Sequence, residues 1–344
     1  MAGVQIPAWA LLEILNRKIS ALHASIVFVL TFVLVIVLYV APTGTFVMST
    51  GTIFSVSDAV VSEERFNTGD ILLAPVSFYG RAFSPPNVHP LDASPIIRVR
   101  AFFDPHAQVH PLPDLVGNST PQQYRRQQAA TQLHAQLVPL AVALGHAGMN
   151  YSLRAQGVLV TEVVSGSPSE GILQANDVIT HVNNAPLHSL EQLLAEIRQS
   201  NETITLTTRR SAESQEVVIP VVDERIGIRA QAYNVTLDYD APISIELGDV
   251  TGSSADVLIA LEALSILTQT DITQGRIISG SGTLSADGSV RAIRGADLKA
   301  LVAQRAGATL FFLPEENEEI DVEGLTIVRV SSFSDVVDYL SSAT

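Results

Sequence analysis

The pattern of hydrophobic and polar positions divides the chain into segments of different character. One uninterrupted apolar stretch, ASIVFVLTFVLVIVLYVA at residues 24–41, contains no charged side chain. Eighteen such residues are just enough to cross the hydrocarbon core of a membrane as a helix. A buried core helix would show a polar face, and a cleaved signal peptide would end in a small-x-small site; this stretch has neither feature. The pattern therefore predicts an uncleaved transmembrane anchor over residues 23–42.

Basic residues set the expected orientation of this anchor. Arg17 and Lys18 precede the apolar stretch, and no Lys or Arg follows it until Arg65. The positive-inside rule then places residues 1–22 in the cytoplasm and the remainder of the chain outside. We therefore expect a single-pass protein of the cell membrane whose C-terminal domains are extracytoplasmic.

Residues 43–149 are expected to form a mixed α/β connector region. Strands are predicted at DILLAPVSFYG and PIIRVRAFF, separated by proline-rich pieces. His106 and His110 have a spacing that suits a metal, but a third ligand is missing, so the pattern favours loop histidines and no metal site. A helix is predicted to begin after a cap at Thr120 and to kink or end at Pro139.

Residues 150–223 change to a pattern of strands and turns. The β-rich run GVLVTEVV is followed by turn signals at SGSP, AND and NNAP. An amphipathic helix, HSLEQLLAEIRQ, comes next, and Ser189 can cap it. Two further strands, TITLTTRR and QEVVIPVV, complete the segment. The order of these elements and the local sequence resemble a bacterial PDZ domain.

The resemblance to PDZ domains implies a groove that binds peptides. It would lie between the helix at residues 189–199 and the strand that contains Gly157, Val158, Leu159 and Val160. A peptide would add to this strand, with its C-terminal carboxylate at the amides near the glycine. The alternative is a PDZ fold that serves only as a spacer or gate over a neighbouring site, since a fold does not fix a function.

The C-terminal segment, residues 224–344, places two serines at a strand-to-helix turn. The strand APISIELGDV is followed by TGSS, which contains Ser253 and Ser254, and then by the apolar helix ADVLIALEALSILTQ. Serine is a good helix cap, but a hydroxyl in this place is also exposed beside free amides that can hold an oxyanion. No histidine follows His188, so a histidine base would have to come from the PDZ region or the connector.

Lysine is the remaining candidate for a general base. The chain contains two lysines: Lys18, on the predicted cytoplasmic side, and Lys299, in the otherwise apolar helix of RGADLKALVAQRAG. Burial disfavours the charged ammonium group and lowers its pKa, so a buried lysine can accept a proton. An isolated lysine is more often a solvated side chain, and the residues alone leave both interpretations open.

Residues 226–317 resemble the proteolytic domain of the Lon family. The nucleophile motif of that family, Gly-Pro-Ser-Ala-Gly, corresponds to Gly252–Asp256, so the resemblance implies Ser254 as the nucleophile. It also implies Lys299 as the base, a hydrogen bond from Ser279 to the lysine amine, and an oxyanion site at the amides around Ser254 and Ala255.

Three positions depart from the motifs of the family. Ser253 replaces a proline, Asp256 replaces a glycine, and Arg294 replaces the first glycine of a Gly-Gly pair. A carboxylate at position 256 is expected to crowd the turn, to oppose negative charge at the oxyanion and to raise the pKa of Lys299. Weakened or lost catalysis is therefore one outcome that the sequence leaves open.

Composition narrows the functional classes. The chain has 20 basic and 35 acidic residues, a net charge of −15, which argues against binding to nucleic acid. It has no cysteine, which excludes disulfides and thiolate catalysis. No GxxxxGK[ST] phosphate loop is present, so neither an ATPase module nor a cofactor is expected.

Together these patterns predict an α+β multidomain protein: a single transmembrane helix, a mixed α/β connector region, a PDZ domain and a Lon-type α+β proteolytic domain. This order resembles a bacterial subgroup of membrane-anchored Lon-like proteases. The implied function is a serine endopeptidase that cleaves unfolded or flexible polypeptides and captures their C-terminal tails in the PDZ groove. A homo-oligomeric ring is implied as well. The alternative is a catalytically degenerate PDZ adaptor or scaffold at the membrane.

Overall fold

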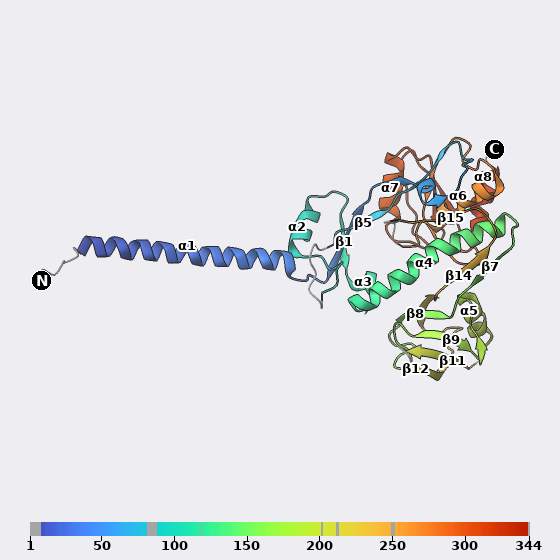
Figure 1. Ribbon diagram of the computed structural model, residues 1–344, viewed down its shortest axis with the longest axis horizontal. Coiled ribbons are helices and arrows are strands. Elements are labelled where there is room, and N and C mark those ends of the chain that lie inside the picture. Colours follow the sequence, from blue (N-terminus) through green and yellow to red (C-terminus); the bar gives the residue numbers. More distant parts are fainter. Residues whose placement is uncertain are drawn as a thin grey trace. The chain divides into compact units, whose positions relative to one another are not determined.

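The computed structural model describes residues 8–80, 88–117, 119–200, 202–210, 213–248 and 252–342. These residues form two compact units, which we treat separately. The first takes in the chain up to Val47 together with Phe78–Leu115, and the second takes in Met48–Ser77 together with Val116–Thr344. Figure 1 labels the helices and strands in chain order.

The first unit begins with a long helix, α1 (Ala8–Val40). Its window His23–Val40 has 18 residues with a mean hydropathy of 2.6, and none of this window is buried. Length and composition therefore make this segment a candidate membrane span, which overlaps the predicted anchor.

A short helix and a small sheet follow α1. The sheet has the order β5-β1-β6, from β1 (Thr45–Thr50), β5 (Val76–Phe78) and β6 (Gln108–Pro111). The helices are α2 (Pro95–Phe102) and α3 (Pro113–Val116). The predicted strand PIIRVRAFF is thus wrong, because it forms α2. Ser94 at the N-cap and Pro95 in the first turn are helix-start residues, and they outweigh the β-branched run that follows.

The PDZ region forms one antiparallel sheet with the order β12-β11-β9-β8-β13, and β10 pairs with β9. Its elements are β8 (Val158–Val163), β9 (Val178–Val182), β10 (Ala185–Pro186), α5 (Leu190–Gln199), β11 (Thr203–Arg210), β12 (Glu213–Pro220) and β13 (Ile228–Ala232). The predicted helix and its cap are confirmed, since the Ser189 hydroxyl accepts a hydrogen bond from the Gln192 amide. Leu193 and Ile197 of this helix are buried in the PDZ core.

The edge of this sheet differs from the prediction. Strand β8, which contains Val158–Val160, is paired on one side with β9 and on the other with β13. The backbone at Gly157 is occupied as well, because its carbonyl accepts a hydrogen bond from the Tyr233 amide. A peptide therefore cannot add to the predicted strand. The sheet also extends beyond the predicted domain end at residue 223, since β13 belongs to it.

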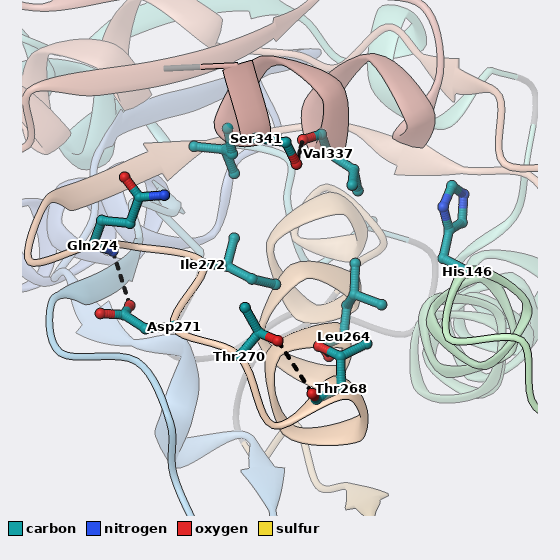
Figure 2. Close-up of a pocket in the computed structure, with 10 residues that line it drawn as sticks. His146, Leu264, Thr268, Thr270, Asp271, Ile272, Gln274, Val337 and Ser341 are labelled. Carbon is teal, nitrogen blue, oxygen red and sulfur yellow. Dashed lines mark hydrogen bonds between the residues drawn. The ribbon is translucent and has the colours of Figure 1, made fainter. Parts of the chain in front are cut away.

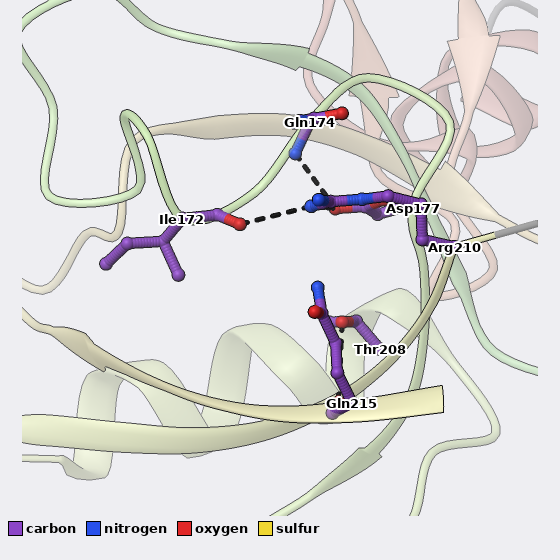
Figure 3. A network of polar contacts seen from close by, with 6 residues as sticks. All are labelled: Ile172, Gln174, Asp177, Thr208, Arg210 and Gln215. Carbon is purple, nitrogen blue, oxygen red and sulfur yellow. Dashed lines mark hydrogen bonds and ion pairs between the residues drawn. The ribbon is translucent and has the colours of Figure 1, made fainter. Parts of the chain in front are cut away.

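An ion pair between a buried carboxylate and a partly exposed arginine holds the long loop of the PDZ region. The Arg210 guanidinium donates two 2.8 Å hydrogen bonds to the Asp177 carboxylate, which also accepts one from the Gln174 amide (Figure 3). Arg210 further donates to the Ile172 carbonyl. The carboxylate is 1% exposed, so its charge is compensated by donors from the protein rather than by water. This network fixes residues 172–177 to the end of β11.

The Lon-type region is built around a second sheet with the order β2-β4-β16-β19-β20. Its strands are β2 (Phe54–Ser55), β4 (Asp70–Leu73), β16 (Ile277–Gly280), β19 (Leu310–Pro314) and β20 (Thr326–Val330). Strand β4 pairs in parallel with β16, although the two are about 200 positions apart in the sequence. Part of the predicted connector is therefore an integral part of this sheet.

Three helices complete this region: α6 (Asp256–Thr268), α7 (Ala296–Arg305) and α8 (Phe333–Ser342). Short elements join them to the remainder of the unit: η1 (Val56–Asp58), β3 (Val60–Val61), β7 (Tyr151–Arg154), β14 (Thr236–Tyr239), β15 (Ser244–Ile245), β17 (Thr283–Leu284) and β18 (Val290–Arg291). The mixed α+β class of the prediction is confirmed for both regions.

Helix α4 (Pro121–His146) packs against α6. Its predicted cap is confirmed, because Thr120 and Gln123 form a reciprocal capping box. Of the two outcomes predicted for Pro139, a kink or an end, the end is not found, since the helix continues to His146. The neighbouring residues Val138 and Leu140 are buried in the core, and this packing outweighs the hydrogen bond that proline removes.

Candidate active site

Helix α6 fixes the position of Ser254. The first ten residues of this helix, Asp256–Ser265, are all buried, and Ala255 is its N-cap. Ser254 comes directly before the cap and is half-buried, so its hydroxyl lies at the rim of the core. A helix that is buried all round cannot rotate or slide without exposing apolar surface. The position of the hydroxyl is therefore tightly constrained.

Helix α7 carries Lys299 one turn from its start. The helix begins at Gly295, which has a positive φ of 65°. A Cβ at this position would lie 2.9 Å from Cγ1 of Val76 and 3.2 Å from Sδ of Met48, so only glycine fits without displacement. The close approach holds the start of α7 against the segments around β1 and β5. Lys299 is 2% exposed.

The two side chains meet although they are 45 residues apart. Nζ of Lys299 lies 2.7 Å from Oγ of Ser254 and 2.8 Å from Oγ of Ser281. The Ser281 hydroxyl donates its own hydrogen to the Ser254 carbonyl at 2.8 Å, so it must accept from the amine. The amine thus donates to both serine hydroxyls and lies within hydrogen-bonding distance of each.

Burial controls the protonation of the amine. Removal of the ammonium group from water lowers the pKa of Lys299 from 10.5 to about 7. A substantial fraction of the amine is then neutral at neutral pH. A neutral amine close to a hydroxyl is the state that a general base requires.

Ser279 does not take the predicted place beside the amine. Its hydroxyl donates a 2.7 Å hydrogen bond to the Leu72 carbonyl, which joins β16 to β4. The side chain beside the amine is Ser281, two residues further along the chain. Ser279 belongs to β16, whereas Ser281 lies just beyond the end of that strand, so strand alternation could not predict which of the two serines faces the amine.

Residues 282–283 lie directly against the nucleophile turn. The Gly282 amide donates to the Ser254 carbonyl at 2.9 Å, and the Val257 amide donates to the Gly282 carbonyl at 3.3 Å. The hydroxyls of Ser253 and Thr283 lie 3.0 Å apart. A Cβ on Gly282 would lie 2.6 Å from Cγ1 of Val290 and 2.8 Å from Cγ2 of Val257, so the position requires glycine.

Asp256 is fully buried, which disfavours the negative charge predicted at this position. Its Oδ2 accepts a 3.1 Å hydrogen bond from the Leu284 amide, so the carboxyl group contacts β17. Burial raises the pKa of Asp256 well above 3.8, and this hydrogen bond lowers it only in part. Burial therefore favours the protonated form of this carboxyl group. The expected increase in the pKa of Lys299 is accordingly not found, since burial lowers that pKa instead.

His134 of helix α4 is a further buried group beside this turn, which the sequence did not indicate. Its Nε2 lies 2.9 Å from the Leu284 carbonyl and 3.8 Å from Oδ2 of Asp256. Burial lowers the pKa of His134, which keeps the imidazole neutral. A connector histidine thus does reach the candidate site, where it contacts Leu284 and Asp256. His134 and Leu284 are 150 positions apart in the sequence, so the local sequence of α4 could not reveal this contact.

The described residues include no group of three or more side chains able to hold a metal ion. A cavity of about 270 Å³ lies elsewhere in the Lon-type region, between the end of α6 and α8 (Figure 2). Its polar side chains are bonded within the chain: Thr270 donates to the Thr268 carbonyl and Ser341 to the Val337 carbonyl. Neither Ser254 nor Lys299 lines it.

Comparison with known families identifies both regions. Residues 143–221 match the PDZ domain family, and residues 204–340 match the Lon protease (S16) C-terminal proteolytic domain. The predicted resemblance to a Lon-like protease with a PDZ domain is thereby confirmed. The chain combines a PDZ domain with a proteolytic domain of the Lon type.

Two Lon proteases are similar in sequence. Lon protease of Aster yellows witches'-broom phytoplasma (strain AYWB) is 39% identical over 92 residues, which cover 25% of this chain and 11% of that protein. Lon protease 2 of Bacillus subtilis (strain 168) is 20% identical over 185 residues, which cover 53% of this chain and 32% of that protein. The chain thus spans at most about a third of the length of these relatives.

Solved structures of PDZ domains are also similar. The PDZ domain of an SdrC-like protein from Listeria monocytogenes is 20% identical, covers 22% of this chain and 87% of that chain, and has a TM-score of 0.21. The PDZ domain of the SdrC-like protein from Listeria innocua is 23% identical. The match covers 23% of this chain and 97% of that chain, with a TM-score of 0.21.

The buried carboxyl group makes a prediction about stability. The pKa of Asp256 is higher in the folded than in the unfolded chain, so its stabilising contribution is complete below about pH 3.8 and decreases as the pH rises. The substitution Asp256→Asn removes this loss of stability at high pH, and its side-chain oxygen can still accept the hydrogen bond from the Leu284 amide. We expect the variant to have a higher Tm than the wild type at pH 8, with a difference that shrinks toward pH 4.

Asp287→Asn is the matched control. Asp287 is exposed, and hydrogen bonds from Ser289 lower its pKa, so its contribution decreases as the pH falls. This variant should show the opposite dependence on pH in the same thermal scans. A Tm for Asp256→Asn below that of the wild type at pH 8 would show that the carboxyl group is ionised in the folded protein.

Proposed function

We propose that this chain is a membrane-anchored serine endopeptidase in which Ser254 and Lys299 form a catalytic dyad. The observation that supports the proposal most strongly is the 2.7 Å separation between the lysine amine and the serine hydroxyl at a site where the amine is 2% exposed. The match of residues 204–340 to a Lon proteolytic domain supports the same reaction class.

In the proposed mechanism, neutral Lys299 accepts the proton of Ser254 while the serine oxygen attacks a peptide carbonyl. Backbone amides around Ser254 and Ala255 stabilise the oxyanion. The ammonium group then returns its proton to the leaving amine, and water hydrolyses the acyl-enzyme with the lysine again acting as base. Ser281 orients the amine in each step through its 2.8 Å hydrogen bond.

The departures from the Lon motif are compatible with this mechanism. Burial raises the pKa of Asp256 and its carboxyl group contacts Leu284, which favours a protonated side chain over a full negative charge beside the oxyanion. Arg294 replaces the first glycine of the Gly-Gly pair. The close packing at the start of α7 requires a glycine only at the second position, and Gly295 occupies that position. The degenerate adaptor is therefore the alternative rather than the leading function.

We further propose that α1 is the anchor, with the domains after it outside the cell. Arg17 and Lys18 precede the 18-residue apolar window and support this orientation. The proposed substrates are unfolded or flexible polypeptides, because this sequence contains no phosphate loop that could power unfolding. Assembly into a homo-oligomeric ring stays a prediction.

Substitution of either member of the dyad tests the proposed reaction. Ser254→Ala and Lys299→Met should each lower cleavage of fluorescent casein by the full chain at least ~10³-fold, because each removes the covalent route. Lys18→Met and Ser289→Ala are matched controls outside the site and should retain activity. A serine-directed fluorophosphonate should label the wild type at Ser254. Equal turnover in all five proteins would contradict the proposal.

The PDZ region offers a second binding function, at a strand that the sequence did not indicate. Strand β13 is the edge of its sheet, and no strand in the described part of the chain pairs with its other side. It also lies near helix α5. An exposed edge beside a helix is the site where PDZ domains accept a peptide strand. We therefore propose Ile228–Ala232 in place of Val158–Val160 as the peptide-binding strand.

Backbone alternation predicts which groups of β13 would bind a peptide. The Gly227 carbonyl and the Tyr233 amide both bond to the β8 side, so Ile228, Ala230 and Ala232 direct their backbone groups outward. Ala230→Pro removes one outward donor and leaves the pairing with β8 intact. It should weaken binding of fluorescent peptides with apolar C-terminal tails by about tenfold or more.

Ala230→Ser keeps the amide and serves as the control, and amidated peptides test the need for a free carboxylate. Fluorescence anisotropy with the full chain measures each affinity. Equal affinities for the proline and serine variants would exclude β13 as the binding strand.

A further inference from the structure

Helix α2 is tied to the end of α1 by a short segment with many hydrogen bonds. The amides of Thr43 and Gly44 donate to Oδ1 of Asp92 at 3.0 and 3.1 Å. The Thr43 hydroxyl donates to the Ala93 carbonyl at 2.6 Å, and the Ala93 amide donates to the Thr45 carbonyl at 2.6 Å. Ser94, the N-cap of α2, follows immediately. The start of α2 is thus fixed to residues just beyond the candidate span.

The length of this tether limits how far α2 can lie from a bilayer. Two residues, Ala41 and Pro42, lie between Val40 and Thr43, and the three Cα–Cα steps from Val40 to Thr43 span at most about 10 Å when fully extended. The headgroup region on each side of the hydrocarbon core is roughly 5–7 Å deep. If α1 spans the membrane, α2 begins at the headgroup level or immediately above it. Figure 1 shows α2 beside the end of α1.

The exposed side of α2 is strongly apolar. Phe102 and Phe103 are 85% and 77% exposed, and Val99, which lies on the same helical face, is 51% exposed. Among the described residues outside α1, three phenylalanines are exposed: Phe78, Phe102 and Phe103. All three belong to the first unit. A soluble surface rarely presents two adjacent aromatic rings to water, so this face points to a partner.

The charged residues of α2 indicate the chemistry of that partner. Arg98 and Arg100 flank Val99 and are exposed. The Arg100 guanidinium also lies 4.9 Å from the centre of the Tyr79 ring, which holds it over the unit surface. The adjacent acids are engaged within the unit, because Asp92 accepts from Thr43 and Gly44, and Asp104 accepts from Tyr79. Aromatic rings beside arginines suit the interface between acyl chains and lipid phosphates.

We propose that α2 is an interfacial membrane helix that inserts Phe102 and Phe103 into the outer leaflet while Arg98 and Arg100 contact lipid phosphates. The inference rests on the proposed anchoring by α1 and adds a second membrane contact to it. Two contacts restrict rotation and tilt of the first unit relative to the bilayer, whereas a single helix leaves both free.

Depth-dependent quenching in a bilayer tests this inference directly. The chain has no cysteine, so single cysteines can be introduced without any background substitution. We choose Phe102→Cys and, independently, Phe103→Cys as reporters on α2, Phe32→Cys within α1, and Val222→Cys on the exposed PDZ surface. Each full-length variant is labelled with an environment-sensitive fluorophore and reconstituted in vesicles of phosphatidylethanolamine and phosphatidylglycerol at 3:1.

Lipids that carry a nitroxide either near the headgroup or deep in the acyl chain then act as quenchers. The label at position 32 should be quenched most by the deep nitroxide. The labels at 102 and 103 should be quenched most by the shallow nitroxide, several-fold more than the label at 222. Arg98→Glu together with Arg100→Glu should reduce the shallow quenching at 103.

The controls separate failure of the inference from failure of the anchor. One result would overturn the interfacial helix but keep the anchor. In it, the label at position 32 is quenched, while the labels at 102 and 103 are quenched no more than the label at 222. Absence of quenching at 32 would overturn the anchor and the inference together. A blue-shifted but unquenched label at both α2 positions would show that a second protein surface, not lipid, covers the two rings, and would also overturn the inference.

Discussion

The hydrogen bond between the Lys299 amine and the Ser254 hydroxyl is the interaction on which the remainder of the account depends. At 2.7 Å it requires that two helices, α6 and α7, be held in register by the core. The same packing that excludes water from the amine lowers its pKa to about 7. Geometry and protonation therefore have one physical cause. A looser core would lose both, since water would restore the charge of the lysine and free its side chain.

Segments far apart in the sequence maintain this arrangement. Strand β4, from residues 70–73, pairs with β16, and the loop that follows β16 carries Ser281 to the amine. Helix α4 adds His134, which bonds to the Leu284 carbonyl while Asp256 accepts from the Leu284 amide. The segment before the PDZ region is thus part of the proteolytic fold. The fold around the site therefore includes contacts from residues outside 224–344.

Local patterns predicted much of the fold and of the site. Helix α5 follows from its apolar spacing and its Ser189 cap, helix α6 follows from apolar spacing, and the rarity of lysine drew attention to Lys299. The sequence could not show contacts that depend on sheet order. It therefore assigned the peptide edge to β8 rather than β13, and chose Ser279 over Ser281 as the partner of the amine. It also treated Asp256 as a charge, because burial is a property of the folded chain.

Direct titration of Lys299 tests the central claim most closely. The chain contains only two lysines, so protein labelled with ¹³C at the lysine ε-carbon gives two resonances, and Lys299→Arg assigns one of them. The account predicts that the Lys299 resonance shifts with a midpoint at about pH 7 in the folded full chain. A midpoint near the ordinary value of 10.5 would contradict it, because the amine would then be solvated and unable to serve as the base for Ser254.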